Sequence, residues 1–280
     1  MSELFLKFLY HTIPGRACLK LFAGKFVSEG CGRFLDSSVS RCLIRGFVRR
    51  NAIRCEDYEQ RRFTSFNDFF TRQIRAGLRP VDHDPDNLIA PCDGYLSAYR
   101  LSELSVIPVK QSRYTVSELL GGDERAARFR NGICLVFRLG VNNYHRYCYA
   151  DSGVKGENIY IPGVLHTVRP IALEKLPVFI RNCREFTELT TERFGHMIQM
   201  EVGALLVGKI QNYDGAGSVI RGQEKGKFLY GGSTVILLLE KDAVKVHEQY
   251  FLATALCREV PVQMGQVIGH ALRASAPAER

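Results

Sequence analysis

The chain has 280 residues and a formal net charge of +9, with 46% hydrophobic and 24% charged residues, which is typical of an ordinary globular protein of one or two domains. The longest clear apolar run, residues 235–239, is far shorter than the roughly 18 residues of a membrane-spanning helix. Polar and charged residues interrupt the N-terminal segment, so we expect neither a secretory signal peptide nor a transit peptide. Nine dispersed cysteines without a CxxC pair indicate reduced thiols in a cytoplasm.

Positive charge is concentrated at the N-terminal end, where residues 1–54 contain ten Lys or Arg and three acidic residues. Phenylalanine and leucine lie between these charges at helical spacing. Basic residues beside apolar faces suit the surface of an anionic bilayer. A basic helical layer that packs on the rest of the protein, with its charges solvated, is the alternative. Nucleic-acid binding is not favoured, because no recognised binding motif accompanies the charge.

The pattern is helical up to about residue 72. Residues 64–68 resemble a helix start, because Ser65 can cap the free amide groups and Asp68 follows three residues later. Residues 75–86 are expected to be a connector.

After residue 80 the chain consists mostly of short runs rich in Val, Ile, Leu, Tyr and Phe, separated by Gly, Pro, Asn and Asp. Strands are expected at residues 94–100, 133–139, 158–161, 178–182, 197–202, 205–211, 227–230 and 234–240. One helix is expected at residues 116–120, with Thr115 as its cap. The predicted fold is therefore α+β, with a helical N-terminal layer over residues 1–72 and a β-rich, antiparallel sandwich-like or barrel-like body over residues 73–280.

The segment with the most informative chemistry is Gly231-Gly232-Ser233-Thr234, which opens a strongly apolar strand. Glycine permits backbone geometries closed to other residues, so a serine after such a bend could attack the preceding carbonyl. A turn before a strand is the structural interpretation of the same residues. The nucleophile elbow of α/β-hydrolases is excluded, because Val235 occupies the position of its second glycine.

Three other segments carry candidate groups. Asp93 lies in a tight turn just before a strand, where an aspartate also commonly bonds its own backbone. His145 follows a strand-like segment and, taken alone, suits a surface or core position as well as a catalytic one. Residues 202–210 are expected to form a pair of strands interrupted by Gly203 and Gly208.

Together these segments resemble the phosphatidylserine decarboxylase family, in order along the chain. Phe69-Phe70-Thr71-Arg72 with Arg79-Pro80 resembles the family's FFTR and RP motifs, and Pro91-Cys92-Asp93-Gly94 resembles P-x-D-G. Further matches are Val109-Lys110 with Tyr114-Thr115-Val116 and Leu119-Leu120-Gly121, then Tyr144-His145-Arg146, Val202-Gly203-Ala204 with Val207-Gly208, and Gly232-Ser233-Thr234-Val235.

The resemblance implies a self-processing, pyruvoyl-dependent enzyme. Ser233 attacks the Gly232 carbonyl, and elimination splits the chain into residues 1–232 and 233–280, which stay together as a heterodimer. Ser233 becomes a covalent pyruvoyl group that forms a Schiff base with phosphatidylserine, releases carbon dioxide and yields phosphatidylethanolamine. Asp93 would act as the charge-relay carboxylate and His145 would transfer protons. The resemblance also implies a peripheral enzyme on the cytoplasmic face of an anionic cell membrane, without a metal or a nucleic-acid partner, and a homo-oligomer is compatible with it.

The sequence departs from the family at one catalytic position. The common motif Y-H-R-x-H-x-P has a second histidine, and Cys148 replaces it here, while Ala150 replaces the proline. The missing base is therefore His145, His166 or Cys148, and we favour His145 because it lies in the matched motif. Gly231 also replaces the leucine of the common Leu-Gly-Ser site, and Gln111 replaces a glycine.

Two other functions remain open at this point. A pyruvoyl decarboxylase of a soluble amino acid would share the cleavage site but would not need the basic apolar N-terminal layer. A non-enzymatic membrane-binding relative could have lost processing through the change at Cys148.

Overall fold

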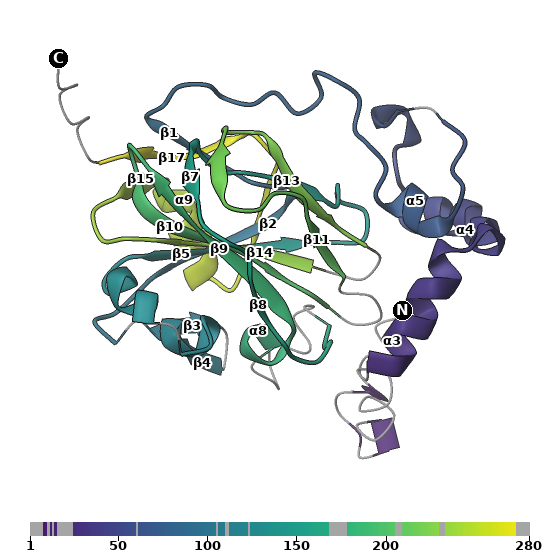
Figure 1. Cartoon of the computed structure of the whole chain (residues 1–280), viewed down its shortest axis with the longest axis horizontal. Helices are drawn as coiled ribbons and strands as arrows, with labels where there is room; N and C mark the ends of the chain where they lie inside the picture. The colour runs from purple at the N-terminus through teal and green to yellow at the C-terminus, as the bar shows by residue number, and fades with distance from the viewer. Residues whose placement is uncertain are drawn as a thin grey trace.

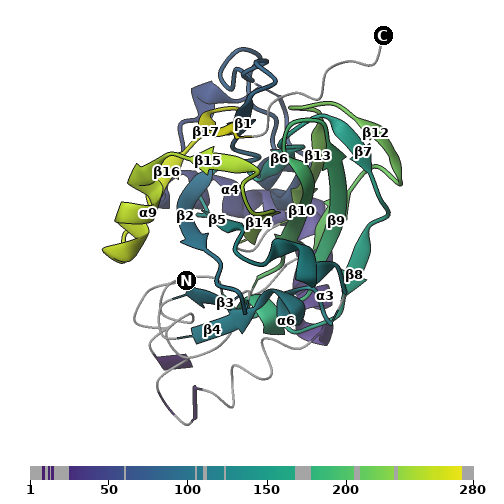
Figure 2. The ribbon, with the colours of Figure 1, turned by 90° about the vertical axis from the view of Figure 1, so that its left-hand side faces the viewer.

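The computed structural model describes residues 8–9, 12, 14–15, 25–59, 61–104, 106–109, 112–122, 124–167, 178–204, 209–229 and 233–272. Its architecture is α+β, which confirms the predicted fold class. A helical layer gathers at one end of a β-rich body (Figures 1 and 2). This layer comprises α3 (Lys25–Asp36), η1 (Ser38–Arg41), α4 (Cys42–Arg50), η2 (Cys55–Asp57) and α5 (Phe66–Phe70).

Capping and amphipathic packing hold the helical layer in place. Ser65 caps α5 as predicted, because its hydroxyl accepts a hydrogen bond from the backbone amide of Asp68 at 3.1 Å. One face of α4 contributes Ile44 and Phe47 to the apolar clusters around α5, and Phe47 meets Phe66 edge to face at 5.0 Å. Among the described residues, no helix has the length and apolar character needed to cross a bilayer.

The main sheet has nine antiparallel strands, and its central strand is β14 (Ser233–Leu239). Every residue of β14 is buried, because apolar clusters cover both faces of the sheet. The strand order is β12 (Gly217–Val219), β7 (Gly153–Lys155), β9 (Arg184–Thr191), β10 (Gly195–Val202), β14, β5 (Ile133–Leu139), β2 (Gly94–Arg100) and β16 (Val260–Val262), and β8 (Ile159–Ile161) also pairs with β9.

Smaller elements cover the two faces of the main sheet. One face packs against helix α9 (Glu248–Ala255) and two three-stranded sheets, β11 (Ile210–Asn212)–β13 (Glu224–Phe228)–β6 (Arg146–Cys148) and β1 (Asn87–Ile89)–β17 (Val267–Ala271)–β15 (Val244–Val246). The other face packs against α6 (Val116–Leu119), η3 (Glu124–Phe129), α8 (Val178–Arg181) and the hairpin β3 (Val106–Val109)–β4 (Ser112–Thr115). This arrangement is a sandwich, and the described strands form no closed barrel.

Several predicted elements differ from the structure. The strand expected at residues 178–182 is wrong, because Val178–Arg181 forms helix α8. Periodicity cannot distinguish a strand from a helix in so short an apolar run. The strand in this region is β9, which begins at Arg184, two residues after the end of the expected run. The charged residues of β9 interrupt its apolar pattern, so the sequence pattern did not predict this strand. Residues 205–208 and 230–232 lie outside the described residues, while β11 and β13 occupy parts of the expected runs 205–211 and 227–230.

Candidate functional site

Ser233 is the first residue of β14, in the centre of the main sheet. It pairs with Leu139 of β5, and its side chain is buried with 1% of its surface exposed. Its hydroxyl has no hydrogen-bond partner among the described residues. A buried polar group without a partner costs about 1–3 kcal/mol, so packing alone does not explain this serine. Gly232, the predicted other side of the cleavage site, lies outside the described residues.

Asp93 directly precedes β2 and lies at the same end of the main sheet as Ser233. The two residues flank β5 on either side, because Tyr95 pairs with Arg138 and Ser233 pairs with Leu139. The carboxylate of Asp93 is buried and accepts two hydrogen bonds from Arg79, at 2.7 and 2.6 Å. The same carboxylate accepts a third hydrogen bond from the backbone amide of Met264 at 2.9 Å.

His145 precedes β6 and has only 1% of its surface exposed. Its Nδ1 lies 2.9 Å from the backbone carbonyl oxygen of Asn143, so Nδ1 carries the proton and Nε2 has a free lone pair. Nε2 is buried and has no hydrogen-bond partner among the described residues. Burial, assisted by the nearby charge of Arg72, lowers the pKa of His145 to about 3. His145 is therefore a neutral proton acceptor at neutral pH, and Asn143 sets its tautomer.

Contacts between the motif segments bring His145 close to the rest of the site. The ring of Phe70 packs against His145 with centroids 4.1 Å apart, and the Arg146 guanidinium donates a hydrogen bond to the Thr71 carbonyl at 2.8 Å. The amide of Cys148 donates to the carbonyl of Pro91, two residues before Asp93, at 2.8 Å. Three segments far apart in sequence therefore converge here.

The connection between β13 and Ser233 also starts beside His145. The amide of Phe228, the last residue of β13, donates a hydrogen bond to the His145 carbonyl at 2.9 Å. The chain then reaches Ser233 within five residues. Among the described residues, however, no hydrogen bond joins His145 to Ser233 or Asp93, so the predicted proximity of all three remains a prediction.

His166 lies near the same end of the main sheet, on the side of β14 where β10 lies. Asn182 accepts a hydrogen bond from the His166 amide at 2.9 Å and donates to the carbonyls of His166 and Gly203, each at 2.7 Å. Gly203 directly follows β10, whose last residue, Val202, pairs with Thr234. Burial lowers the pKa of half-buried His166. Its backbone is thus tied to the strand beside Ser233.

Cys148, which occupies the place of the second histidine, is completely enclosed. Burial raises the pKa of its thiol to about 12, so the thiol stays protonated at neutral pH. This property argues against the cysteine as the base.

Arg72 is a buried cation that the sequence prediction did not assign to the site. Its guanidinium lies over the rings of Tyr58 and Phe69, at 4.0 and 4.7 Å. One nitrogen donates weakly to backbone carbonyls, while Nε and Nη2 are buried without a partner among the described residues. The side chain lines a pocket of about 590 Å³, which Ile44, Val48 and other residues of the helical layer complete. A buried guanidinium that lines a pocket and has two nitrogens without a partner among the described residues has the chemistry to bind an anion.

The chain is similar to known proteins over most of its length. The model of the phosphatidylserine decarboxylase family matches residues 66–270. Phosphatidylserine decarboxylase proenzyme 2 of Clostridium acetobutylicum is 41% identical over 265 residues, which is 94% of this chain and 91% of the relative. The phosphatidylserine decarboxylase proenzymes of Clostridium botulinum strain 657 and Clostridium tetani are 38% and 39% identical, covering 96% and 88% of this chain and 93% and 84% of the relatives. The chain therefore belongs to the phosphatidylserine decarboxylase family, a family of carboxy-lyases.

Proposed function

We propose that this chain converts phosphatidylserine to phosphatidylethanolamine and carbon dioxide, with a pyruvoyl group that it makes by cleaving itself between Gly232 and Ser233. The observation that carries the proposal is the Ser233 hydroxyl, which is buried at the start of the central strand and has no partner in the residues that the structure describes. The names of the relatives support the substrate and the proenzyme state.

The proposed cleavage needs only the chain itself and water. Oγ of Ser233 bonds to the Gly232 carbonyl carbon, the peptide C–N bond breaks, and the hydroxyl proton ends on the nitrogen. The peptide has then become an ester. Loss of the α-proton of residue 233 and of the Gly232 carboxylate leaves a dehydroalanine. Its imine form takes up water and releases ammonia, so the chain of residues 233–280 begins with the pyruvoyl group.

The surroundings of Ser233 fit such a group. Residue 233 is held by the β14–β5 ladder in a buried position, and its side chain shares a sheet face with the apolar residues Val235 and Leu237. When bound, the pyruvoyl group supplies a carbonyl that captures the substrate amine and accepts the electron pair released with carbon dioxide. Exclusion of water protects this carbonyl from side reactions.

We assign proton transfer in cleavage, decarboxylation or both to His145. Its neutral ring and free Nε2 lone pair suit a proton acceptor. Asp93, held by Arg79, is the proposed carboxylate at the same sheet end, and His166 is the second candidate histidine.

The pocket of the helical layer is the proposed entrance for the lipid. Its apolar lining suits acyl chains, and Arg72 can bind the phosphate or carboxylate of the headgroup. Arg41, the last residue of η1, and Arg45 and Arg49 of α4 are exposed at intervals of four residues, and Arg45 and Arg49 also line the pocket. These cations support peripheral binding of residues 1–72 to the cytoplasmic face of an anionic membrane.

Release of carbon dioxide from phosphatidylserine labelled in the serine carboxyl group tests the function. The wild-type protein should release the label from phosphatidylserine vesicles but not from free labelled serine. Ser233→Ala should release none. Release from free serine alone would favour the soluble amino-acid decarboxylase, and no release from either compound would overturn the proposal.

A further inference from the structure

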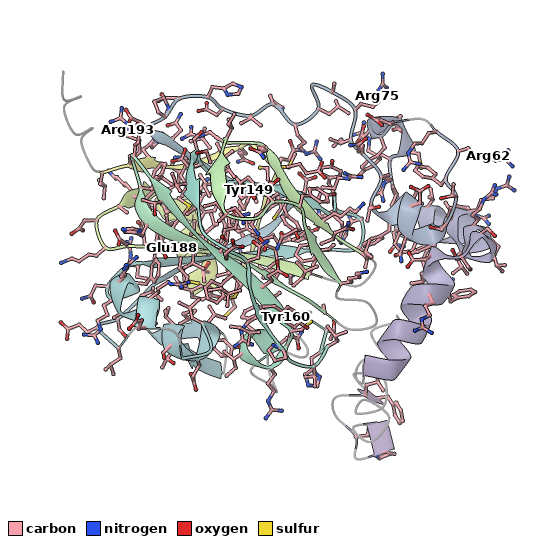
Figure 3. The ribbon with its side chains drawn as sticks, viewed as in Figure 1. Arg62, Arg75, Tyr149, Tyr160, Glu188 and Arg193 are labelled. Atoms are coloured by element: carbon pink, nitrogen blue, oxygen red, sulfur yellow. The ribbon has the colours of Figure 1, made fainter. Side chains whose placement is uncertain are left out.

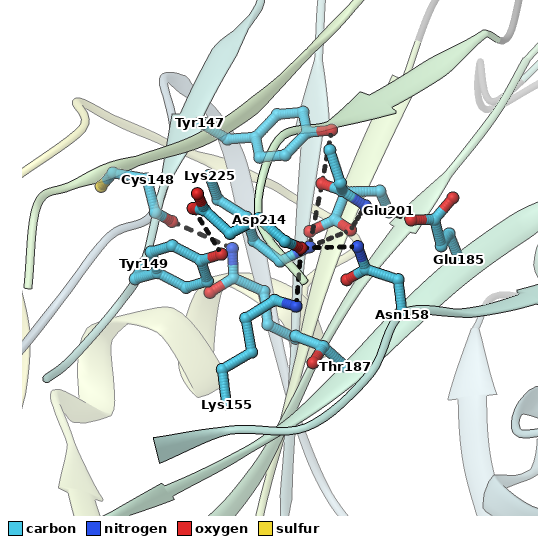
Figure 4. Close-up of polar contacts among 12 residues, drawn as sticks. Tyr147, Cys148, Tyr149, Lys155, Asn158, Glu185, Thr187, Glu201, Asp214 and Lys225 are labelled. Carbon is cyan, nitrogen blue, oxygen red and sulfur yellow. Dashed lines mark hydrogen bonds and ion pairs between the residues drawn. The ribbon is translucent and has the colours of Figure 1, made fainter. Parts of the chain in front are cut away.

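A fully buried ion pair lies between the main sheet and the β11–β13–β6 sheet (Figure 4). The Lys225 ammonium of β13 donates to Oε2 of Glu201 in β10 at 2.5 Å, and both side chains have no exposed surface. Asn212 accepts a second hydrogen bond from Lys225 at 3.0 Å and donates to Glu201 and Glu185 at 3.2 and 2.7 Å. The other carboxylate oxygen of Glu201, Oε1, is buried and has no partner among the described residues.

Strand register places this carboxylate beside Ser233. Glu201 pairs with Val235, so both side chains lie on the same face of the sheet. Ser233 is on this face too, two residues before Val235, and is thus the diagonal neighbour of Glu201. Such neighbours have Cα atoms about 7–8 Å apart, within reach of a long side chain. Extending the register by one residue puts Gly203 opposite Ser233, and a glycine has no side chain to fill the space between them.

The two neighbouring groups are chemically complementary. Within the described part of the chain, the Ser233 hydroxyl is a buried donor without an acceptor, and Glu201 Oε1 is a buried acceptor without a donor. A purely structural ion pair in a core is expected to satisfy its remaining lone pairs, because otherwise desolvation exceeds the Coulombic gain. Glu201 instead has one oxygen without a donor among the described residues, on the face of the sheet where Ser233 lies.

We propose that Glu201 is a catalytic residue of self-cleavage, whose Oε1 accepts the hydrogen of the Ser233 hydroxyl as Oγ bonds to the Gly232 carbonyl carbon. The proton then passes from Glu201 to the nitrogen that leaves Gly232, so the carboxylate is regenerated when the ester forms. Lys225 and Asn212 fix the other oxygen and orient the carboxylate. This inference rests on the proposed self-cleavage and leaves the later proton transfers to His145.

The basicity of Glu201 suits this step better than that of an ordinary carboxylate. Burial raises its pKa, and the Lys225 charge partly opposes this effect. A carboxyl group with a raised pKa is a stronger proton acceptor when ionised, and enzymes use buried glutamates in this way. The charged groups around Glu201 include Lys225 from β13, Glu185 from β9 and Lys155 from β7.

The test compares Glu201→Gln with Glu185→Gln in the full-length chain. Glu185 is the matched control, because it binds the same Asn212 and lies beside Glu201 in the sheet but one strand farther from Ser233. Fragment release is followed on gels with and without hydroxylamine, which splits the ester directly, and folding is followed by thermal melting. Glu201→Gln should slow release at least about 100-fold, with no rescue by hydroxylamine. Glu185→Gln should cleave at close to the wild-type rate.

Three outcomes would overturn the inference. These are a wild-type cleavage rate in folded Glu201→Gln, rapid hydroxylamine cleavage of that variant, and equal slowing in Glu185→Gln. If Glu201→Gln fails to fold, the double variant Glu201→Gln/Lys225→Met, which removes both buried charges, is tested instead. Cleavage of this double variant in its folded form at the wild-type rate would overturn the inference as well. Failure of the wild-type chain to cleave would instead contradict the proposed function.

Discussion

The imidazole of His145 packs against the phenyl ring of Phe70, with ring centroids 4.1 Å apart. This contact joins the helical layer to the β-rich body at the candidate site. The hydrogen bond from Arg146 to the Thr71 carbonyl adds a second link. Phe70 and Thr71 of the helical layer thus form part of the wall around His145, which links the proposed lipid pocket to the proposed catalytic site.

Substitution of the three candidate bases should separate their roles. His145→Ala should block fragment release, decarboxylation or both, because it removes the free Nε2 lone pair. Cys148→Ala should process normally, since its thiol is protonated at neutral pH. His166→Ala tests the second candidate histidine, which lies at the same end of the main sheet. Gel analysis of fragment release decides the matter, and loss of release in Cys148→Ala alone would identify the thiol as the base.

His145 should make folding sensitive to mild acid. Its pKa is about 3 in the folded chain and about 6.5 when unfolded, so below pH 6.5 only the unfolded state takes up the proton. Stability from this residue is complete above pH 6.5 and falls as the pH drops toward 3, by about 2 kcal/mol between pH 6.5 and 5. Urea unfolding of Ser233→Ala at the two pH values, with and without His145→Gln, measures this loss. An unchanged pH dependence in the double variant would contradict the assignment.

Arg72 should contribute to substrate binding. Replacing it with Gln removes charge-assisted hydrogen bonds to the headgroup, each worth about 1.5–3 kcal/mol, and should lower kcat/KM about 10- to 100-fold, chiefly through KM. Arg62→Gln is the matched control, because Arg62 is an exposed arginine of the same layer (Figure 3). Steady-state kinetics on mixed vesicles provide the measurement. Equal effects of the two substitutions would indicate general membrane attraction rather than headgroup binding.

Three exposed arginines at the end of η1 and in α4 should support membrane binding. Neutralising Arg41, Arg45 and Arg49 with Gln should weaken sedimentation with anionic vesicles about 100-fold, because each cation contributes about 1 kcal/mol near such a surface. The triple Lys variant retains the charge and should bind like the wild type. Added salt should reduce wild-type binding without abolishing it, since the layer also exposes Phe34, Val39 and Leu43. Unchanged binding of the Gln variant would show that these charges are only solvated.

The sequence predicted the fold class, the cap at Ser65 and a strand at residues 234–240, which is β14, because capping and long apolar runs are local signals. It misassigned Val178–Arg181, where a short apolar run has no distinctive period. Two contacts depend on tertiary packing and left no local signal, namely Arg79 with Asp93 and Lys225 with Glu201. A polar residue at a core-facing position of β10 was the only available indication of Glu201.

The intact mass of the purified protein tests self-cleavage at Ser233 most directly. The wild-type chain should give two species, residues 1–232 and residues 233–280, and the smaller one should lack a free amino terminus because pyruvoyl formation releases that nitrogen. Ser233→Ala should remain one chain of 280 residues. A wild-type protein that stays a single 280-residue chain after long incubation would contradict the account.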